Sequence, residues 1–141
     1  MALASLWGGI VLANAGLGAV HGLVAPLGGR CSIPHGIGCA CLLVETMRAN
    51  LEALRSRAPR SPALARYDEA ARAFEAPNAD GALEELSALR TKLGVGSLGS
   101  LGMKPEDIAP IVSSSRGGSM RFNPVELTDA ELGAILRASM G

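Results

Sequence analysis

The chain has 141 residues, which is enough for one domain with a substantial core. Its 13 lysines and arginines balance its 13 aspartates and glutamates, so bulk charge provides no attraction to nucleic acid or to an anionic membrane. Only 3% of the residues are aromatic, which also argues against stacking on single-stranded nucleic acid. We therefore expect a single domain over residues 1–141 and no nucleic-acid partner.

Residues 1–29 contain no lysine, arginine, aspartate or glutamate. A membrane-spanning helix needs about 20 apolar residues, so a membrane-anchored protein is one alternative. Against it, no positive charge follows Met1, and seven glycines interrupt the run together with Asn14 and His21. We instead expect a core helix that is apolar all round, buried against other parts of the protein, and no membrane insertion.

The two histidines, His21 and His35, lie on either side of a segment rich in glycine and proline. His21 follows the uncharged run, and His35 stands between Pro34 and Gly36, where a loop leads into the next helix. We expect this turn to bring the end of one helix beside the start of the next. Because neutral imidazole binds iron, zinc, copper and nickel, the pair predicts a site for one divalent metal. Two ligands are fewer than catalytic sites usually have, so we expect weak affinity.

The three cysteines, Cys31, Cys39 and Cys41, make an odd count without a secretory context, which favours reduced thiols in a cytoplasmic protein. Cys31, His35 and Cys39 recur every four residues, as on a zinc-binding helix face, but Pro34 argues against a continuous helix there. We interpret the three thiols as small core residues. The alternative is that Cys31, the cysteine nearest in sequence to the histidine pair as a whole, becomes a further ligand and shifts the preference towards zinc.

The middle of the chain predicts amphipathic helices. The first extends from Gly38 to about Leu54. Its apolar stripe consists of Met47, Leu51 and Leu54. Ser61 then caps a helix that begins with Pro62 and extends to about Phe74. Asp80 caps the next one. Its expected buried stripe consists of Leu83, Leu86, Leu89 and Leu93.

The last third predicts shorter helices separated by polar loops. Residues 94–102 contain four glycines and two serines, without the Lys-Ser/Thr of a phosphate loop, and indicate a connector. Lys104-Pro105 begins a short helix, and residues 113–119 form a polar loop. Thr128 and Glu131 form a capping box for the last helix. Its inward residues are Leu132, Ile135 and Leu136. With no strand pattern, the fold class is all-α, a multi-helix bundle.

The segments around the histidines also carry a family resemblance. The motif consists of Asn14-Ala-Gly-Leu-Gly-Ala-Val-His21-Gly, Pro26-Leu-Gly-Gly29 and Ile33-Pro-His-Gly36. It resembles the signature of the iron-containing (group III) alcohol dehydrogenases, a family that includes the maleylacetate reductases. Leu42-Leu43, Met47-Arg-Ala-Asn50 and the segment from Asn123 to Leu132 extend the resemblance over essentially the whole chain. It implies the helical C-terminal domain of that family, with His21 and His35 as ligands of the catalytic metal, Fe2+ or alternatively Zn2+.

The implied activity is that of an oxidoreductase that moves a hydride between a small alcohol or carbonyl substrate and the nicotinamide of NAD(P). In the family, an aspartate and a further histidine from upstream helices complete the metal site, and an N-terminal α/β domain binds the nucleotide. Residues 1–141 contain neither, so the chain looks N-terminally truncated. We expect NAD(P) binding only with the missing domain and no catalysis by this chain alone. The alternatives are a non-catalytic helical remnant, a metal-binding or interaction protein, or a maleylacetate reductase-like enzyme.

Two departures from the family pattern concern the site. Ala25 occupies the position of the family's proton-relay histidine, so no catalytic side chain is assigned, and Val44-Glu45-Thr46 replaces a Leu-Pro-His segment. Close packing around the metal is expected from the small residues Gly22, Gly28, Gly29 and Gly36. If the neighbours of the first helix lie outside the chain, an apolar patch remains, and we expect self-association or a homo-oligomer.

Overall fold

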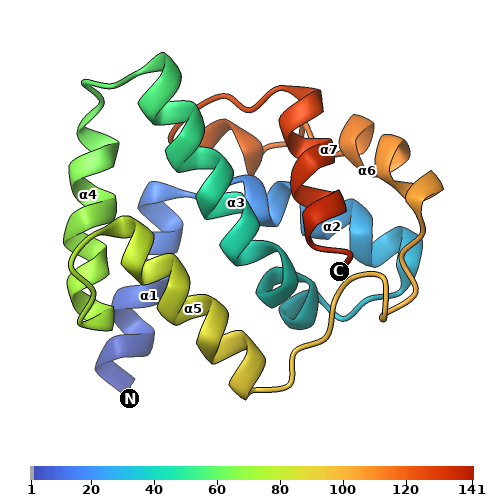
Figure 1. The fold of residues 1–141 in the computed structure, drawn as a ribbon, viewed down its shortest axis with the longest axis horizontal. Coiled ribbons are helices and arrows are strands. Elements are labelled where there is room, and N and C mark those ends of the chain that lie inside the picture. The colour runs from blue at the N-terminus through green and yellow to red at the C-terminus, as the bar shows by residue number, and fades with distance from the viewer. Residues whose placement is uncertain (1) are drawn as a thin grey trace.

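The computed structural model describes residues 2–141, which form seven α-helices and three short 3-10 helices, with no strand in this part of the chain (Figure 1). The α-helices are α1 (Ala2–Ala15), α2 (Ala19–Cys31), α3 (His35–Arg57), α4 (Pro62–Ala71), α5 (Ala79–Lys92), α6 (Ile108–Ser114) and α7 (Asp129–Ala138). The 3-10 helices are Arg72–Phe74, Pro105–Asp107 and Met120–Phe122. The predicted all-α class is confirmed.

Helix α3 is the central helix of the fold and crosses the middle of Figure 1. It packs against α2 and α7 on one side and against α4 and α5 on the other. Leu42 and Leu54 on α3 are fully buried, and Leu51 is 1% exposed, because the helix has neighbours along most of its length. The larger apolar cluster joins α2, α3, α6 and α7, and a smaller one joins α3 to α4 and α5.

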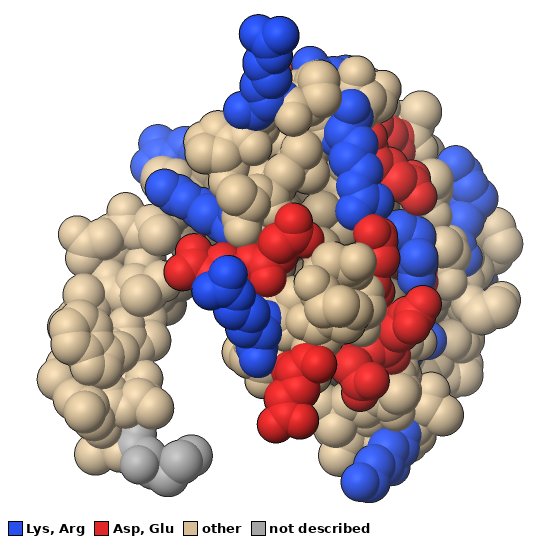
Figure 2. Space-filling view, turned by 60° about the vertical axis from the view of Figure 1, so that its left-hand side comes forward, with Lys and Arg blue, Asp and Glu red and all other residues tan. Residues whose placement is uncertain are grey.

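The uncharged N-terminal run is two helices and not one. The chain breaks at Gly16, whose φ of +69° suits glycine, and α1 and α2 meet at 94°. Helix α2 buries Leu23, Val24 and Leu27, but α1 has no buried residue and stands off the charged body of the molecule in Figure 2. The expectation that the whole uncharged run is a core helix is therefore wrong for α1.

The same two helices bear on the membrane alternative. Among the described residues no single helix is long and apolar enough to span a bilayer. Within residues 2–141, α1 and α2 taken together are long and apolar enough, but the pair is bent by 94°.

Two predicted helix starts are confirmed by their caps. The Ser61 hydroxyl accepts a hydrogen bond from the Ala63 N–H at 3.3 Å, with Pro62 as the first helical residue. At α7, Thr128 Oγ1 accepts from the Glu131 N–H at 3.2 Å, and the Glu131 carboxylate accepts from the Thr128 N–H at 2.7 Å. These caps satisfy backbone donors that have no partner within the helix.

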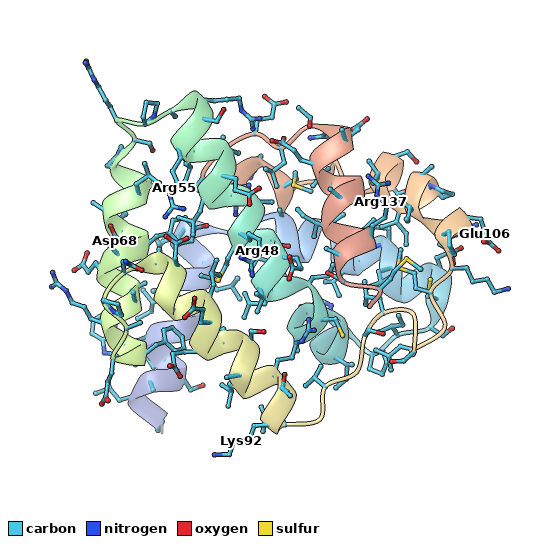
Figure 3. All side chains as sticks on the ribbon, viewed as in Figure 1. Arg48, Arg55, Asp68, Lys92, Glu106 and Arg137 are labelled. Carbon is cyan, nitrogen blue, oxygen red and sulfur yellow. The ribbon has the colours of Figure 1, made fainter. Side chains whose placement is uncertain are left out.

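The start and the stripe of α5 differ from the prediction. Asn78 caps the helix by accepting from the Gly81 N–H at 3.0 Å, whereas Asp80 forms an ion pair with Arg55 at 2.6 Å. Arg55 lies on the side of α3 that faces α4 and α5 (Figure 3). Leu83 is buried, but Leu89 is 45% and Leu93 68% exposed, because the C-terminal half of α5 extends beyond its neighbours. The connector at residues 94–102 is non-helical as predicted, while Ser113 and Ser114 belong to α6.

Candidate metal centre

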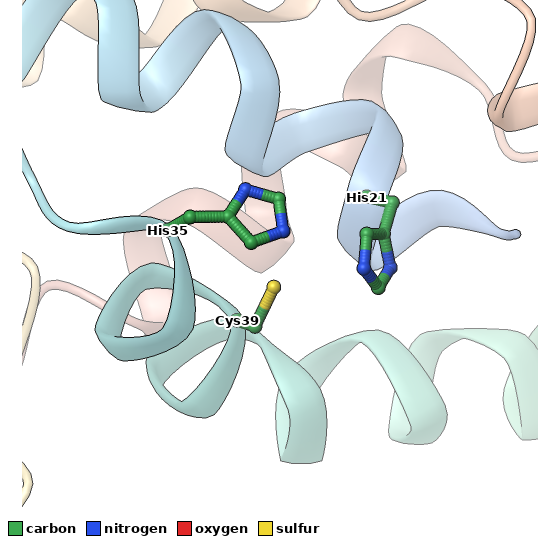
Figure 4. A group of neighbouring side chains, drawn as sticks. All are labelled: His21, His35 and Cys39. Carbon is green, nitrogen blue, oxygen red and sulfur yellow. The ribbon is translucent and has the colours of Figure 1, made fainter. Parts of the chain in front are cut away.

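Three potential metal ligands meet where α2 begins beside the first turns of α3. His21 lies in the first turn of α2, His35 is the first residue of α3, and Cys39 follows one turn later. The two imidazole rings lie 5.3 Å apart between centroids, tilted by 51°. One ligand atom from each of the three side chains lies within 4.8 Å of the others. In Figure 4 the His35 ring extends towards His21, and the Cys39 sulfur points between the two rings.

The histidines converge by a different route from the one expected. The segment between them is mostly helical, because α2 continues through Pro26 to Cys31, and only residues 32–34 form the turn. His21 therefore lies at the start of a helix and not at its end. Proline removes one hydrogen bond from a helix, but the buried face of α2 offsets that loss here. The expected Gly/Pro-rich turn is wrong, whereas the closeness of the two rings is observed.

Glycines allow α2 to approach its neighbours. A Cβ on Gly38 would lie 2.7 Å from Val24 Cγ2, and a Cβ on Gly22 would lie 2.6 Å from Met120 Cε. Gly22 thus has the predicted packing role. Nothing lies within 4 Å of a Cβ at Gly29 or Gly36, so the expectation of close packing is wrong there.

The fourth predicted glycine, Gly28, has only an ordinary contact of 3.4 Å, to the Ile33 carbonyl oxygen. Sequence reasoning missed Gly38. The available signal was its helical spacing, since Gly38 and Cys39 follow His35 by three and four residues and share its face of α3.

A hydrogen-bonded asparagine pair holds the start of α2. Asn123 Oδ1 accepts from the Ala19 N–H at 3.0 Å, and Asn123 Nδ2 donates to Asn50 Oδ1 at 2.6 Å and to the Val125 carbonyl at 2.8 Å. Asn50 Nδ2 in turn donates to the Tyr67 hydroxyl oxygen at 3.2 Å. The network joins α2, α3, α4 and the loop before α7. Its contact with α2 is at Ala19, two residues before His21.

A pocket of about 530 Å³ adjoins the ligand cluster. It lies between the α1–α2 junction and α3, and its wall includes His21, Cys39, Thr46, Tyr67 and Phe122. The described residues that line it include no charged side chain. The hydroxyl of Thr46 in this wall is buried without a hydrogen-bond partner among the described residues. The pocket is therefore largely apolar, with polar atoms at a few defined positions.

The pocket environment affects the ionisable ligands. Burial, and secondarily the charge of His35, lowers the pKa of His21, which favours the neutral imidazole. Burial raises the pKa of the Cys39 thiol, so without a cation nearby the protonated form is favoured.

The other two cysteines lie outside the cluster. Cys41 is fully buried and its thiol donates to the Gly96 carbonyl at 3.2 Å, as expected for a core residue. The Cys31 thiol lies 3.7 Å from Asp107 Oδ2. The alternative of Cys31 as a further ligand is thus wrong, because the end of α2 directs its side chain towards Asp107. Cys39, interpreted from the sequence as a core residue, is partly buried, packs against the larger apolar cluster and also lines the pocket.

The donor set fits a transition metal. Zinc binds nitrogen at about 2.0–2.1 Å and thiolate sulfur at about 2.3 Å, which places two ligand atoms of a tetrahedron about 3.3–3.6 Å apart. The ligand atoms of His21, His35 and Cys39 lie up to 4.8 Å apart, and small rotations of these side chains would shorten the separations to this range. Imidazole nitrogen also suits iron. Ala25, one turn after His21 on α2, carries no group that transfers a proton.

Known proteins share this sequence and fold. A sequence profile described as "Fe-containing alcohol dehydrogenase family, C-terminal" matches residues 1–140. Alcohol dehydrogenase 4 of Schizosaccharomyces pombe is 34% identical over 99% of this chain and 32% of its own length. Lactaldehyde reductase of Escherichia coli K12 is 32% identical over 82% of this chain and 30% of its own length.

Solved structures agree. A crystal structure of 1,3-propanediol oxidoreductase superposes with a TM-score of 0.83 at 28% identity, covering 96% of this chain and 36% of that one. Sulfoacetaldehyde reductase from Bifidobacterium kashiwanohense, solved with NAD+, gives a TM-score of 0.68 at 27% identity, covering 87% of this chain and 31% of that one. The chain thus spans about a third of the length of these relatives. It belongs to the Fe-containing alcohol dehydrogenase family and corresponds to the C-terminal region of that family.

Proposed function

We propose that this chain is the metal-binding, helical part of an NAD(P)-dependent oxidoreductase that interconverts alcohols and carbonyl compounds. The observation that carries the proposal is the His21–His35 pair, with 5.3 Å between ring centroids, beside an uncharged pocket. Its support in the family is that the relatives named above are alcohol dehydrogenases and aldehyde reductases. The rest of the metal site and the nucleotide site belong, on this proposal, to a further part of the enzyme.

His21 and His35 would hold a divalent metal at the edge of the pocket, where the metal would supply Lewis acidity towards an alcohol or carbonyl oxygen, and NAD(P) would be the hydride carrier. The asparagine pair Asn50–Asn123 fixes the start of α2 and so orients His21. The mostly apolar pocket wall would contact the carbon skeleton of the substrate.

A chimera tests this function. The matching segment of Klebsiella pneumoniae 1,3-propanediol dehydrogenase, 36% of that protein, is replaced by this chain. We expect NAD-dependent oxidation of 1,3-propanediol, loss of turnover in His21→Ala, and unchanged turnover in the control Cys31→Ser, whose thiol contacts Asp107 outside the pocket. A general acid–base group contributes about 100-fold or more, so Ala25→His should raise turnover if an imidazole relays protons there.

The chimera also has an outcome that contradicts the proposal. If it folds and binds NAD+ but its turnover and metal content are the same with and without His21, the histidine pair is not the metal site. Circular dichroism and nucleotide-binding fluorescence establish folding independently of turnover.

A further inference from the structure

We propose that Cys39 is a third metal ligand, so that this chain forms a His2Cys site whose preferred metal is zinc. The inference rests on the proposed role of the two histidines and extends it. Its basis is the cluster of His21, His35 and Cys39, in which one ligand atom from each residue lies within 4.8 Å of the others.

The backbone places Cys39 in position for this role. His35 and Cys39 are four residues apart on α3, so their side chains share one face of the helix. The same face carries Gly38, against which Val24 of α2 packs, and the close approach brings His21 across to that face. In Figure 4 the sulfur of Cys39 points into the space between the two imidazole rings. A metal at that point is reached by all three side chains with small rotations.

The surroundings of Cys39 distinguish it from the other two thiols. Cys41 is fully buried and donates to a carbonyl, and the Cys31 thiol contacts a carboxylate. Cys39 is only partly buried, lines the pocket, and its sulfur has no hydrogen-bond partner among residues 2–141. A partly exposed thiol beside two imidazoles is a better ligand than a filler of the core.

The chemistry of binding balances without a change of oxidation state. The Cys39 S–H bond breaks, its proton passes to the solvent, and the thiolate binds the divalent metal. The two neutral imidazoles bind through ring nitrogens and release no proton. In this chain taken alone, the three ligands leave one tetrahedral position, which is free for a ligand from the rest of the enzyme or for the substrate. Thiolate is a soft ligand, and with two imidazoles it favours zinc over ferrous iron.

Cobalt(II) is the spectroscopic probe for the experiment, because a thiolate bound to it gives a near-ultraviolet charge-transfer band that imidazole does not give. The purified chain, Cys39→Ser, the control Cys31→Ser and His21→Ala are each titrated with CoCl2. We expect the charge-transfer band in the wild type and in Cys31→Ser and its absence in Cys39→Ser, with affinity about 10-fold or more lower. Zinc should displace the cobalt, whereas ferrous iron under anaerobic conditions should not.

The outcomes separate this inference from the proposed function. Cobalt binding that depends on His21 but shows no charge-transfer band and is unchanged in Cys39→Ser overturns the ligand role of Cys39 and leaves the histidine pair intact. Cobalt binding that is unaffected by His21→Ala overturns both. A variant counts only if its circular dichroism matches that of the wild type. If Cys39→Ser does not fold, Cys39→Ala replaces it. Absence of the band from the wild type at saturating cobalt overturns the inference, as does a band that is kept in the folded Cys39 variant.

Discussion

Gly38 determines how closely α2 approaches α3. A Cβ at this position would lie 2.7 Å from Val24 Cγ2, and the branched valine side chain has little freedom to move away. We expect Gly38→Ala to lower the free energy of unfolding by about 1–3 kcal/mol through overpacking. Because the two helices carry the ligands, the affinity for cobalt should fall as well.

Gly36→Ala is the matched control, since nothing lies within 4 Å of a Cβ there and both glycines lie in the first turns of α3. Alanine should stabilise this helix by about 0.5–1 kcal/mol. Urea unfolding and cobalt titration measure both effects. Equal stability and affinity in the two variants would contradict the packing argument.

Asn123 joins the loop before α7 to the start of α2. Asn123→Ala removes the acceptor of the Ala19 N–H and the donor to Asn50, which is 4% exposed. Leaving buried polar groups unpaired costs about 1–3 kcal/mol, so we expect a loss of stability of that order. Because the start of α2 carries His21, metal affinity should fall too. Chemical unfolding and cobalt titration check this, and an unchanged affinity would show that α2 is positioned without the asparagine.

The sequence predicted part of the site. His21 and His35 stood out because the chain has only two histidines and they lie on either side of a segment rich in glycine and proline. Cys39 was not predicted as a ligand, because a free cysteine in an apolar run is usually a core residue, and only the packing of α2 on α3 shows which way it points. The asparagine pair was missed for the same reason, since residues 50 and 123 meet only through tertiary structure.

Helix α7 is held to α3 by an ion pair that also caps its N-terminus. Arg57 Nη1 donates to Glu131 Oε1 at 2.7 Å, and this bond, together with those from Thr128, lowers the pKa of Glu131. A carboxyl whose pKa is lower in the folded state stabilises the fold above its unfolded pKa, about 4.3, and that stability is lost as the pH falls through the lower folded value. We therefore expect Glu131→Gln to cost about 0.5–1 kcal/mol at pH 7 and nothing at about pH 2.

Thermal or urea unfolding at several pH values measures this difference. The control is Glu84→Gln, since Glu84 is exposed on α5. If the difference between the wild type and Glu131→Gln stays constant from pH 7 to acid, the carboxylate does not act through its charge.

Element prediction was most successful where a single residue provides the capping hydrogen bond. Ser61 and Thr128 start helices as expected, because their hydroxyls accept from the backbone locally. The start of α5 was assigned to Asp80 and lies at Asn78, since both residue types cap equally well and Asp80 pairs with Arg55. The break between α1 and α2 was not predicted, although Gly16 and Gly18 are its local signal.

The molecule as a whole exposes an apolar helix. Six large apolar side chains of α1 are 43–66% exposed. They are Leu3, Leu6, Trp7, Ile10, Val11 and Leu12. Because monomers usually tolerate patches of only a few hundred Å², we expect this chain to self-associate through α1 at micromolar concentrations. The double substitution Leu6→Glu and Trp7→Glu should restore a monomer, while the control Lys92→Glu at the end of α5 should not.

Multi-angle light scattering reports the molar mass of each variant. A monodisperse monomer for the unmodified chain would contradict this prediction. Association that survives the two glutamates would place the contact elsewhere on the molecule.

The central claim is that His21 and His35 bind one metal ion between them. Equilibrium dialysis against zinc, followed by elemental analysis, measures the metal bound per chain directly. The account predicts about one zinc per wild-type chain, strongly reduced binding in His21→Ala and in His35→Ala, and unchanged binding in Cys31→Ser. The account would be contradicted if both histidine variants bound as much zinc per chain as the wild type. It would also be contradicted if the wild type bound no zinc at saturating concentration.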